Sequence, residues 1–180
     1  MLNELFTIGH SQHAAEEFVG LLRQHQIAAL VDIRRFPGSR KYPQFGQEDL
    51  AKVLQQHGIE YHWLQSLGGR RPKVKDFVSP NGGLRNASFR NYADYMLTDA
   101  FREGIARLKA IAEAKRTAIM CAESVFWRCH RRLVSDFWVA GGGSVQHIFP
   151  NGEAKPHQLT EGAKLQDGNV TYPGPQLLFD

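Results

Sequence analysis

Cysteine is scarce in this sequence, which holds only Cys121 and Cys129 among its 180 residues. Two cysteines are too few to staple a chain of this size, so the sequence excludes a disulfide-rich secreted scaffold and predicts free thiols in a reducing compartment. Long apolar runs are missing as well. None approaches the roughly 20 residues that a bilayer-spanning helix needs, and no basic region leads an apolar stretch near the amino terminus. We therefore expect a cytoplasmic protein without a membrane partner.

The composition also lacks any extreme. Hydrophobic residues make up 42% and charged residues 22% of the chain, as in ordinary folded proteins, which excludes a disordered or fibrous chain. The length fits a single domain. Lys and Arg exceed Asp and Glu by 22 to 18, which gives a net charge of +4. That excess is compatible with a polyanionic partner and by itself identifies none.

Short apolar runs alternate along the chain with apolar residues at helical spacing. The first pattern predicts buried strands and the second predicts helices. The strands are predicted at 5–8, 28–33, 59–64, 117–121 and, as the last of them, 145–148. The helices are predicted around 18–22, around 50–54 with Gly58 as the cap, and at 89–97, 99–114 and 131–140. This alternation predicts an α/β fold with a mostly parallel central sheet flanked by helices.

Two regions lack clear periodicity. Residues 68–86 are rich in Gly, Pro, Lys and Arg, and a loop of this length inside a domain is typical of a functional element. We interpret it as a lid or binding arm. Residues 149–180 carry Gly and Pro throughout. We expect the α/β domain to occupy 1–148 and this irregular C-terminal extension to pack on it.

The chemically distinctive residues follow the predicted strands. In sheets of this kind, ligands bind outside the carboxyl ends of the strands. The rule collects the segments 9–11, 32–40, 63–71 and 121–131. We expect all four to converge on one edge of the sheet.

Six strings occur in order along the chain, namely TIGHS, VDIRRFPGSR, LGGRR, FRNYADYM, MCAE and WRCHR. Together they resemble the bacterial family called domain of unknown function 488, DUF488, over residues 6–148. The resemblance implies a compact α/β domain with shared site positions. It implies no activity, so the chemistry must be argued from the residues.

The candidate catalytic residues are His10, Asp32, Glu123 and Cys121. A histidine titrates near neutrality, and a desolvated carboxylate can hold a proton, so a His10 and Glu123 pair suits acid–base work. Cys121 precedes a predicted helix, whose amino terminus favours a thiolate. Six residues separate it from Arg128, whereas phosphatase loops place five between cysteine and arginine, so a buried, inert thiol is the competing interpretation.

A metal site is a further alternative, with Cys121, Cys129, His130 and His10 as thiolate and imidazole ligands. Adjacent residues of a helix point to different faces, so at most one of Cys129 and His130 could reach a shared ion. We assign no metal ligand on this pattern. The sequence predicts no particular cofactor and no oligomeric state.

Arginines gather in the edge segments, and arginine binds phosphate through two parallel hydrogen bonds. Aromatic residues accompany them and could stack on bases. The competing interpretation is a structural network in which Asp32 pairs with Arg34 or Arg131. We expect the following residues to bind the ligand: Ser11, Arg34, Arg40, Tyr61, Trp63, Arg70, Arg71, Arg90, Tyr92, Arg128, His130 and Arg131.

These features favour an enzyme, such as a hydrolase, that acts on a nucleotide or nucleic acid in a basic, aromatic-lined cleft. A carboxylate beside such a cleft resembles the arrangement that base-processing enzymes use on an extruded base. The His-x-Glu and Pro-Cys-x-x-Cys signature of the zinc deaminases is absent. The alternatives are a module that binds nucleic acid or a phosphorylated ligand without chemistry, and a Cys/His metal or thiol site.

Overall fold

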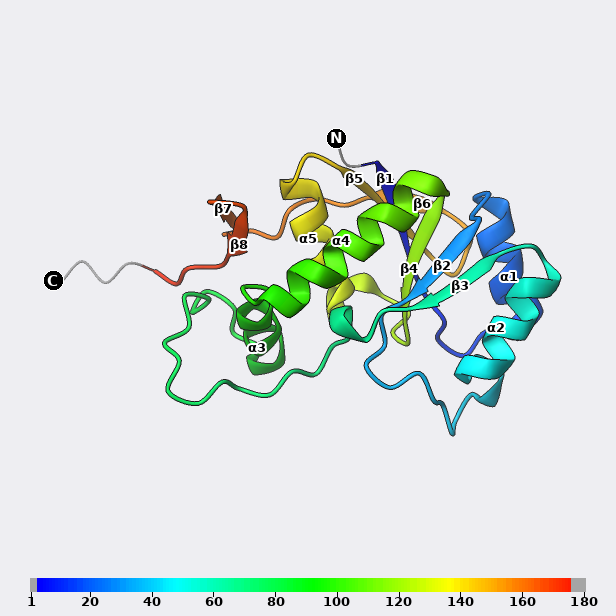
Figure 1. Cartoon of the computed structure of the whole chain (residues 1–180), viewed down its shortest axis with the longest axis horizontal. Coiled ribbons are helices and arrows are strands. Elements are labelled where there is room, and N and C mark those ends of the chain that lie inside the picture. Colours follow the sequence, from blue (N-terminus) through cyan, green and yellow to red (C-terminus); the bar gives the residue numbers. More distant parts are fainter. Residues whose placement is uncertain (1–2, 176–180) are drawn as a thin grey trace, which may run out of the picture.

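A six-stranded sheet organises residues 3–175, the part of the chain that the computed structural model describes (Figure 1). Its order is β3-β2-β4-β1-β5-β6. The strands are β1 (Glu4–Gly9), β2 (Ala29–Asp32), β3 (Glu60–Trp63), β4 (Thr117–Cys121), β5 (Ser144–Ile148) and β6 (Ala154–Pro156). All neighbours are parallel except β6, which runs antiparallel to β5. Strands β2 and β4 are buried along their whole length, which explains their continuous apolar runs.

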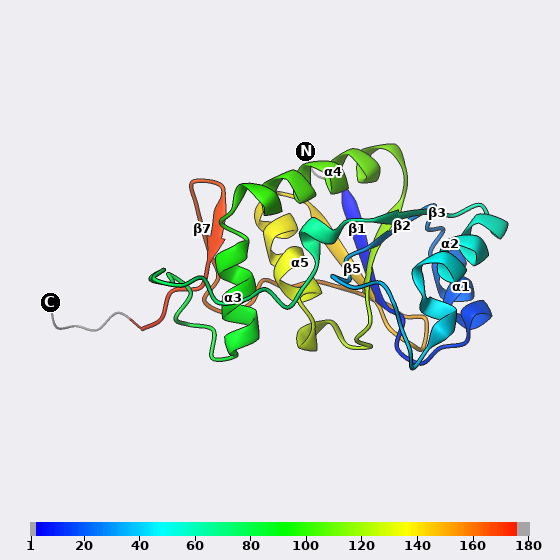
Figure 2. The same ribbon diagram turned by 60° about the horizontal axis from the view of Figure 1, so that its bottom comes forward.

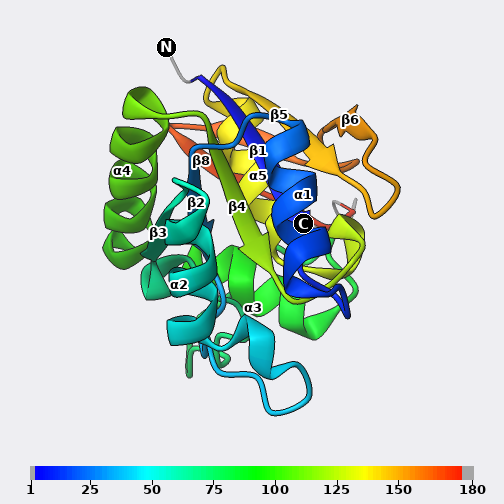
Figure 3. The ribbon, with the colours of Figure 1, turned by 90° about the vertical axis from the view of Figure 1, so that its right-hand side faces the viewer.

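Helices cover both faces of the sheet. One face carries α1 (Ala15–Gln24) and α2 (Gln47–Gln56), and the other carries α3 (Ala87–Tyr95), α4 (Asp99–Ala114) and α5 (Arg131–Ala140). Figure 3 shows α1 and α4 on opposite sides of the strands. Each strand alternates between the two cores because successive side chains point to opposite faces.

The carboxyl ends of the central strands lie level with one another. In the parallel register, Gly9 of β1 is opposite Cys121 of β4, and Asp32 of β2 is opposite Met120. The ladder continues past the strands, because the His10 N–H donates to the Cys121 carbonyl at 2.9 Å and the Ser11 N–H to the Ala122 carbonyl at 3.0 Å. The view in Figure 2 brings this edge of the molecule forward.

The predicted fold class is confirmed, and one detail is wrong. The strand at β5 is not the last, because β6 and the hairpin of β7 (Lys164–Gln166) and β8 (Asn169–Thr171) follow it. Each of these strands has three residues, too few to show alternation. The hairpin turn is made by Asp167 and Gly168, both with positive φ, a turn that matches the twist of paired strands.

The C-terminal segment is tied to α5 by a buried carboxylate. Asp136 accepts hydrogen bonds from His157 at 2.7 Å and from the Tyr172 hydroxyl at 2.7 Å. The side chains of all three residues are buried. Residues 149–175 therefore pack against the α/β body, and the predicted extension beyond them, 176–180, lies outside the described residues. No helix in residues 3–175 is long and apolar enough to cross a membrane.

Candidate functional site

A cleft of about 700 Å³ opens at the carboxyl edge of the sheet. It is walled by the segments that follow β1, β2, β3 and β4, by α3 and by the residues just before α5. Nine predicted site residues line it: His10, Ser11, Arg34, Arg70, Tyr92, Cys121, Glu123, Arg128 and His130. Seven others lie outside its wall: Asp32, Arg40, Tyr61, Trp63, Arg71, Arg90 and Arg131. The rule that ligands bind at the carboxyl ends of parallel strands therefore predicted where the cleft lies. Which side chains face the cleft depends on the hydrogen bonds and packing of each residue.

A buried ion pair forms part of the floor. Asp32 has no exposed surface and Arg34 is 7% exposed. The Arg34 Nη2 donates to Asp32 Oδ2 at 2.7 Å and its Nε to Oδ1 at 2.9 Å. Tyr61 donates its hydroxyl to the same carboxylate at 2.6 Å, and the indole N–H of Trp63 donates to the Arg34 carbonyl at 2.9 Å. Of the two partners expected for Asp32, the structure selects Arg34, because Arg131 bonds elsewhere.

Tyr61 and Trp63 thus support the floor from behind instead of lining the cleft. Burial and the neighbouring carboxylate of Asp32 raise the pKa of the Tyr61 hydroxyl well above its usual range. The hydroxyl therefore remains a hydrogen-bond donor at neutral pH. It fixes the carboxylate that in turn fixes Arg34.

His10 sits deep in the cleft and is 3% exposed. Its ring stacks on Phe45 with the centroids 4.4 Å apart. Its Nδ1 lies 2.8 Å from the Ser11 carbonyl, which can only accept, so Nδ1 carries the proton and Nε2 is an acceptor 3.5 Å from Arg34 Nη1. Burial lowers the pKa of His10 to about 4. The imidazole is therefore neutral at pH 7.

Glu123 lies two residues after the end of β4 and close to the end of β1. Its side chain is exposed and lines the cleft, and among residues 3–175 it forms no ion pair. Its backbone carbonyl points inward, where a Cβ built on Gly9 would lie 1.7 Å away from the oxygen. The glycine of TIGHS therefore lets the loop after β4 pass close to β1 and present Glu123 to the cleft.

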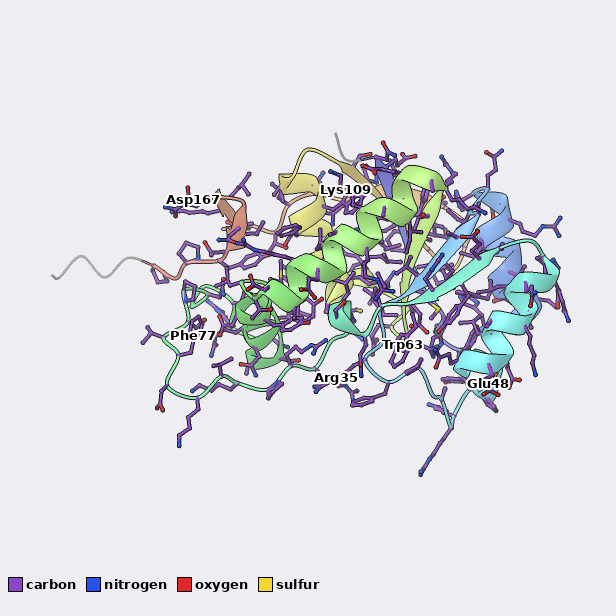
Figure 4. All side chains as sticks on the ribbon, viewed as in Figure 1. Arg35, Glu48, Trp63, Phe77, Lys109 and Asp167 are labelled. Atoms are coloured by element: carbon purple, nitrogen blue, oxygen red, sulfur yellow. The ribbon has the colours of Figure 1, made fainter. Side chains whose placement is uncertain are left out.

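Positive charge dominates the wall of the cleft. Arg34, Arg35, Lys41, Arg70 and Arg128 line it, against the one carboxylate of Glu123. Arg34 is neutralised by Asp32, and within the described chain the other four cations form no ion pair. Figure 4 shows Arg35 and Trp63 close to the carboxyl ends of β2 and β3. Aromatic rings also line the cleft, those of Phe36, Tyr42, Phe89 and Tyr92.

Other arginines predicted to bind the ligand donate instead to backbone carbonyls of the loops. Arg71 donates to the carbonyls of Gly68 at 3.0 Å and Gln65 at 2.6 Å and lies over the ring of Tyr95. Arg90 donates to the carbonyl of Leu84 at 3.0 Å. These bonds shape the start and the end of the 68–86 loop. Sequence alone could not distinguish these arginines from Arg70, which lines the cleft, because all three follow β3 in the chain.

Arg131, on the first turn of α5, is buried beneath the cleft with 1% exposure. It donates to the Thr7 hydroxyl at 3.0 Å and to the Glu123 carbonyl at 2.8 Å. Cys129, which the sequence interpretation considered only as a ligand of an alternative metal site, lines the cleft together with Cys121. The signal that could have identified it is the Cys-His-Arg string just before the start of a helix. Within residues 3–175, no group of three or more His, Cys, Asp or Glu residues is placed to hold a metal ion.

Comparison with known proteins gives one match. The family model described as "Domain of unknown function DUF488" matches residues 14–138. Neither the curated proteins nor the solved structures provide a match. The matched segment begins before α1 and ends within α5, so it contains the ends of β2 and β4 and most of the cleft wall. The chain therefore belongs to the DUF488 family.

Proposed function

We propose that the cleft holds a nucleotide or a segment of nucleic acid, and that the protein is an enzyme, such as a hydrolase, that acts on this ligand. The observation that carries the proposal is the imbalance of charge on the wall, five cations to one carboxylate. Four of those cations have no carboxylate partner within the described chain. A phosphate is the group that such a set recognises best, because arginine can offer two parallel donors to it.

The aromatic rings support a ligand that carries bases. Phe36 is 68% exposed at the cleft, so one face of its ring is free to stack. Phe89 and Tyr42 line other parts of the same cleft. Stacking of a base on an aromatic ring contributes about 1 to 3 kcal/mol and tolerates any base. Cations for phosphates together with rings for bases favour a nucleotide unit over inorganic phosphate.

The chemistry falls to Glu123 in this proposal. Its carboxylate has no ion-pair partner within the described chain, so it is free to take or give a proton. His10 is a neutral imidazole whose Nε2 accepts hydrogen bonds, because burial lowers its pKa to about 4. In this proposal His10 accepts a hydrogen bond from the substrate or from a water molecule and so orients it. Glu123 accepts or donates the proton that is transferred in the reaction.

A module that binds the same ligand without chemistry is the second candidate. The exposure of Glu123 favours it, because catalytic carboxylates are often desolvated to tune their proton affinity. The two candidates differ in what Glu123 does. An enzyme needs its carboxylate in turnover, and a binding module does not.

The test uses labelled single-stranded RNA, single-stranded DNA, duplex DNA and nucleotides, with binding followed by fluorescence anisotropy and products by mass spectrometry. We expect binding at low salt, and conversion that falls about 100-fold in Glu123→Gln while affinity is retained. Arg128→Ala should weaken binding about 10-fold through loss of one charged contact. Binding without any product in the wild type would establish the second candidate. Failure of every ligand to bind would overturn the proposal.

A further inference from the structure

The Arg131 guanidinium is a buried cation without a carboxylate partner. Its hydrogen bonds go to neutral oxygens, those of Thr7, Glu123 and Ser124. Its Nε has no hydrogen-bond partner among the described residues. A buried charge without a counter-charge costs several kcal/mol. An anion next to Arg131 would therefore stabilise the folded protein.

The two cysteines are the neighbours that can supply this negative charge. Burial lowers the pKa of the Arg131 guanidinium, but the negative charge that the two cysteine sulfurs can carry, together with their hydrogen bonds, outweighs burial and raises it. The backbone N–H of Arg131 donates to the Cys129 sulfur at 3.4 Å. Cys129 also lies just before α5, whose amino terminus favours negative charge. These contacts stabilise a thiolate at Cys129.

The His130 ring faces the Cys129 sulfur as a hydrogen-bond acceptor, and burial lowers the pKa of His130, so the ring stays neutral and the Cys129 proton leaves to solvent in the cleft. Its Nε2 lies 2.8 Å from the Ile33 carbonyl, which only accepts, so Nε2 carries the hydrogen of the neutral ring. The lone pair is then on Nδ1, which lies 3.4 Å from the Cys129 sulfur. Burial raises the pKa of Cys129, but hydrogen bonds from Cys121 and Arg131 and the charge of Arg131 outweigh it and lower the pKa to about 7.

The pKa of the Cys121 thiol is shifted in the opposite direction from that of Cys129. Burial and its hydrogen bond with Cys129 raise the pKa of the Cys121 thiol well above its usual value. Its sulfur also lies 3.7 Å from the Glu123 carbonyl oxygen, which is a second acceptor for the same S–H. Cys121 therefore keeps its proton while Cys129 ionises. Both residues line the cleft, whose volume of about 700 Å³ suits a small molecule.

We propose that Cys129 and Cys121 form a thiol–disulfide exchange pair that reduces small disulfides entering the cleft, with Cys129 as the attacking thiol and Cys121 as the resolving thiol. The Cys129 thiolate attacks one sulfur of the substrate RS–SR, a mixed disulfide forms, and RS⁻ leaves and takes up a proton. Cys121 then loses its proton and attacks the Cys129 sulfur, which releases the second RS⁻. The protein is oxidised by two electrons to the Cys121–Cys129 disulfide, and the substrate is reduced to two thiols.

The cations of the wall favour an anionic substrate of this class. Arg70 and Arg128 line the same cleft as the two thiols. A disulfide with carboxylate groups, such as oxidised glutathione, would be attracted to them. The inference does not rest on the proposed action on nucleotides, because its readout is the state of the two sulfurs.

The test treats the native protein with oxidised glutathione and follows the intact mass. We expect the wild type to lose two hydrogen atoms and to retain no glutathione. The variant Cys121→Ser should retain one glutathione on Cys129, and Cys129→Ser should react about 100-fold more slowly than the wild type. Ser144→Ala, at the exposed start of β5 and outside the cleft wall, is the matched control and should react as the wild type does.

A second measurement needs no variant. Limited alkylation of the native wild type with iodoacetamide, mapped by peptide mass spectrometry, should modify Cys129 before Cys121. The rate of Cys129 alkylation should rise as the pH passes about 7, because the thiolate that reacts forms there. The groups that face Cys129 are Cys121, His130, Arg131 and Tyr92. None of them is a carboxylate. Earlier labelling of Cys121, or labelling of both only after denaturation, would overturn the proposal.

Discussion

At Gly9 the end of β1 and the loop after β4 approach more closely than a side chain permits. A Cβ at this position would lie 1.7 Å from the Glu123 carbonyl oxygen and 2.5 Å from its carbon. Both are backbone atoms, so the clash can be relieved only by separating β1 from the loop after β4. We expect Gly9→Ala to destabilise the protein by about 3 kcal/mol, measured by urea unfolding.

Gly20 provides the matched control for this prediction. It lies exposed in α1, and a Cβ added there meets nothing within 4 Å. Gly20→Ala should stabilise the protein by about 0.5 to 1 kcal/mol, because alanine favours a helix. If the two substitutions had equal effects, the close approach at Gly9 would not be the reason for the glycine.

The residues that the sequence could place in the cleft are those next to a strand end. His10 follows β1, Cys121 ends β4 and Glu123 lies two residues beyond it, so the parallel register of the two strands brings them together. Arg131 could not be placed in this way. Its direction depends on the Thr7 hydroxyl and the Glu123 carbonyl, which come from segments distant in sequence.

Among the elements, those with many apolar residues in a clear period were predicted best. The predicted strand at 117–121 and the helices at 99–114 and 131–140 agree with β4, α4 and α5. Their periodic burial is a local property of the sequence. The strands β6 to β8 were missed, because their pairing partners and not their own three residues determine that they are extended.

The 68–86 loop has a free half and an anchored half. Residues 72–78 are exposed (Phe77 is labelled in Figure 4). Further on, the Asn81 side chain is fully buried, where it donates to Asp94 at 2.7 Å and accepts from the Tyr172 N–H at 2.9 Å. Any movement as a lid is therefore confined to the first half of the loop.

Trypsin should cut the native protein first in that free half, after Lys73 or Lys75. Both lysines are exposed and precede the anchor at Asn81, and proteases prefer exposed loop segments. If the loop closes over a bound ligand, cleavage should slow when single-stranded oligonucleotide is added. Gel electrophoresis with mass mapping of the fragments measures both effects.

Two outcomes would contradict this description of the loop. First cleavage after Arg85 would mean that the Asn81 anchor does not hold the second half. Equal cleavage rates with and without a ligand that is shown to bind would remove the lid from the mechanism. In that case the loop is a fixed part of the cleft wall.

For the whole molecule, the distribution of charge matters more than its sum. The net charge is only +4, yet five cations and one carboxylate line a single cleft. The remaining surface is consequently close to neutral overall. On α4, for example, Lys109 lies 3.8 Å from Glu113, and Figure 4 shows Lys109 on the far side of the molecule from the carboxyl edge.

If nucleic acid binds in the cleft, the salt dependence of its affinity should arise from the cations of the cleft wall. Each phosphate contact releases about one counterion, so the logarithm of the affinity should fall linearly with that of the salt concentration. Replacing Arg70 and Arg128 together by alanine should weaken binding and reduce the slope by about 2. Replacing Arg107 and Lys109, both exposed on α4, removes the same charge elsewhere and should leave the slope unchanged. If the α4 pair changed the slope more than the cleft pair, the polyanion would bind another face, and the cleft would be left for a small anionic ligand.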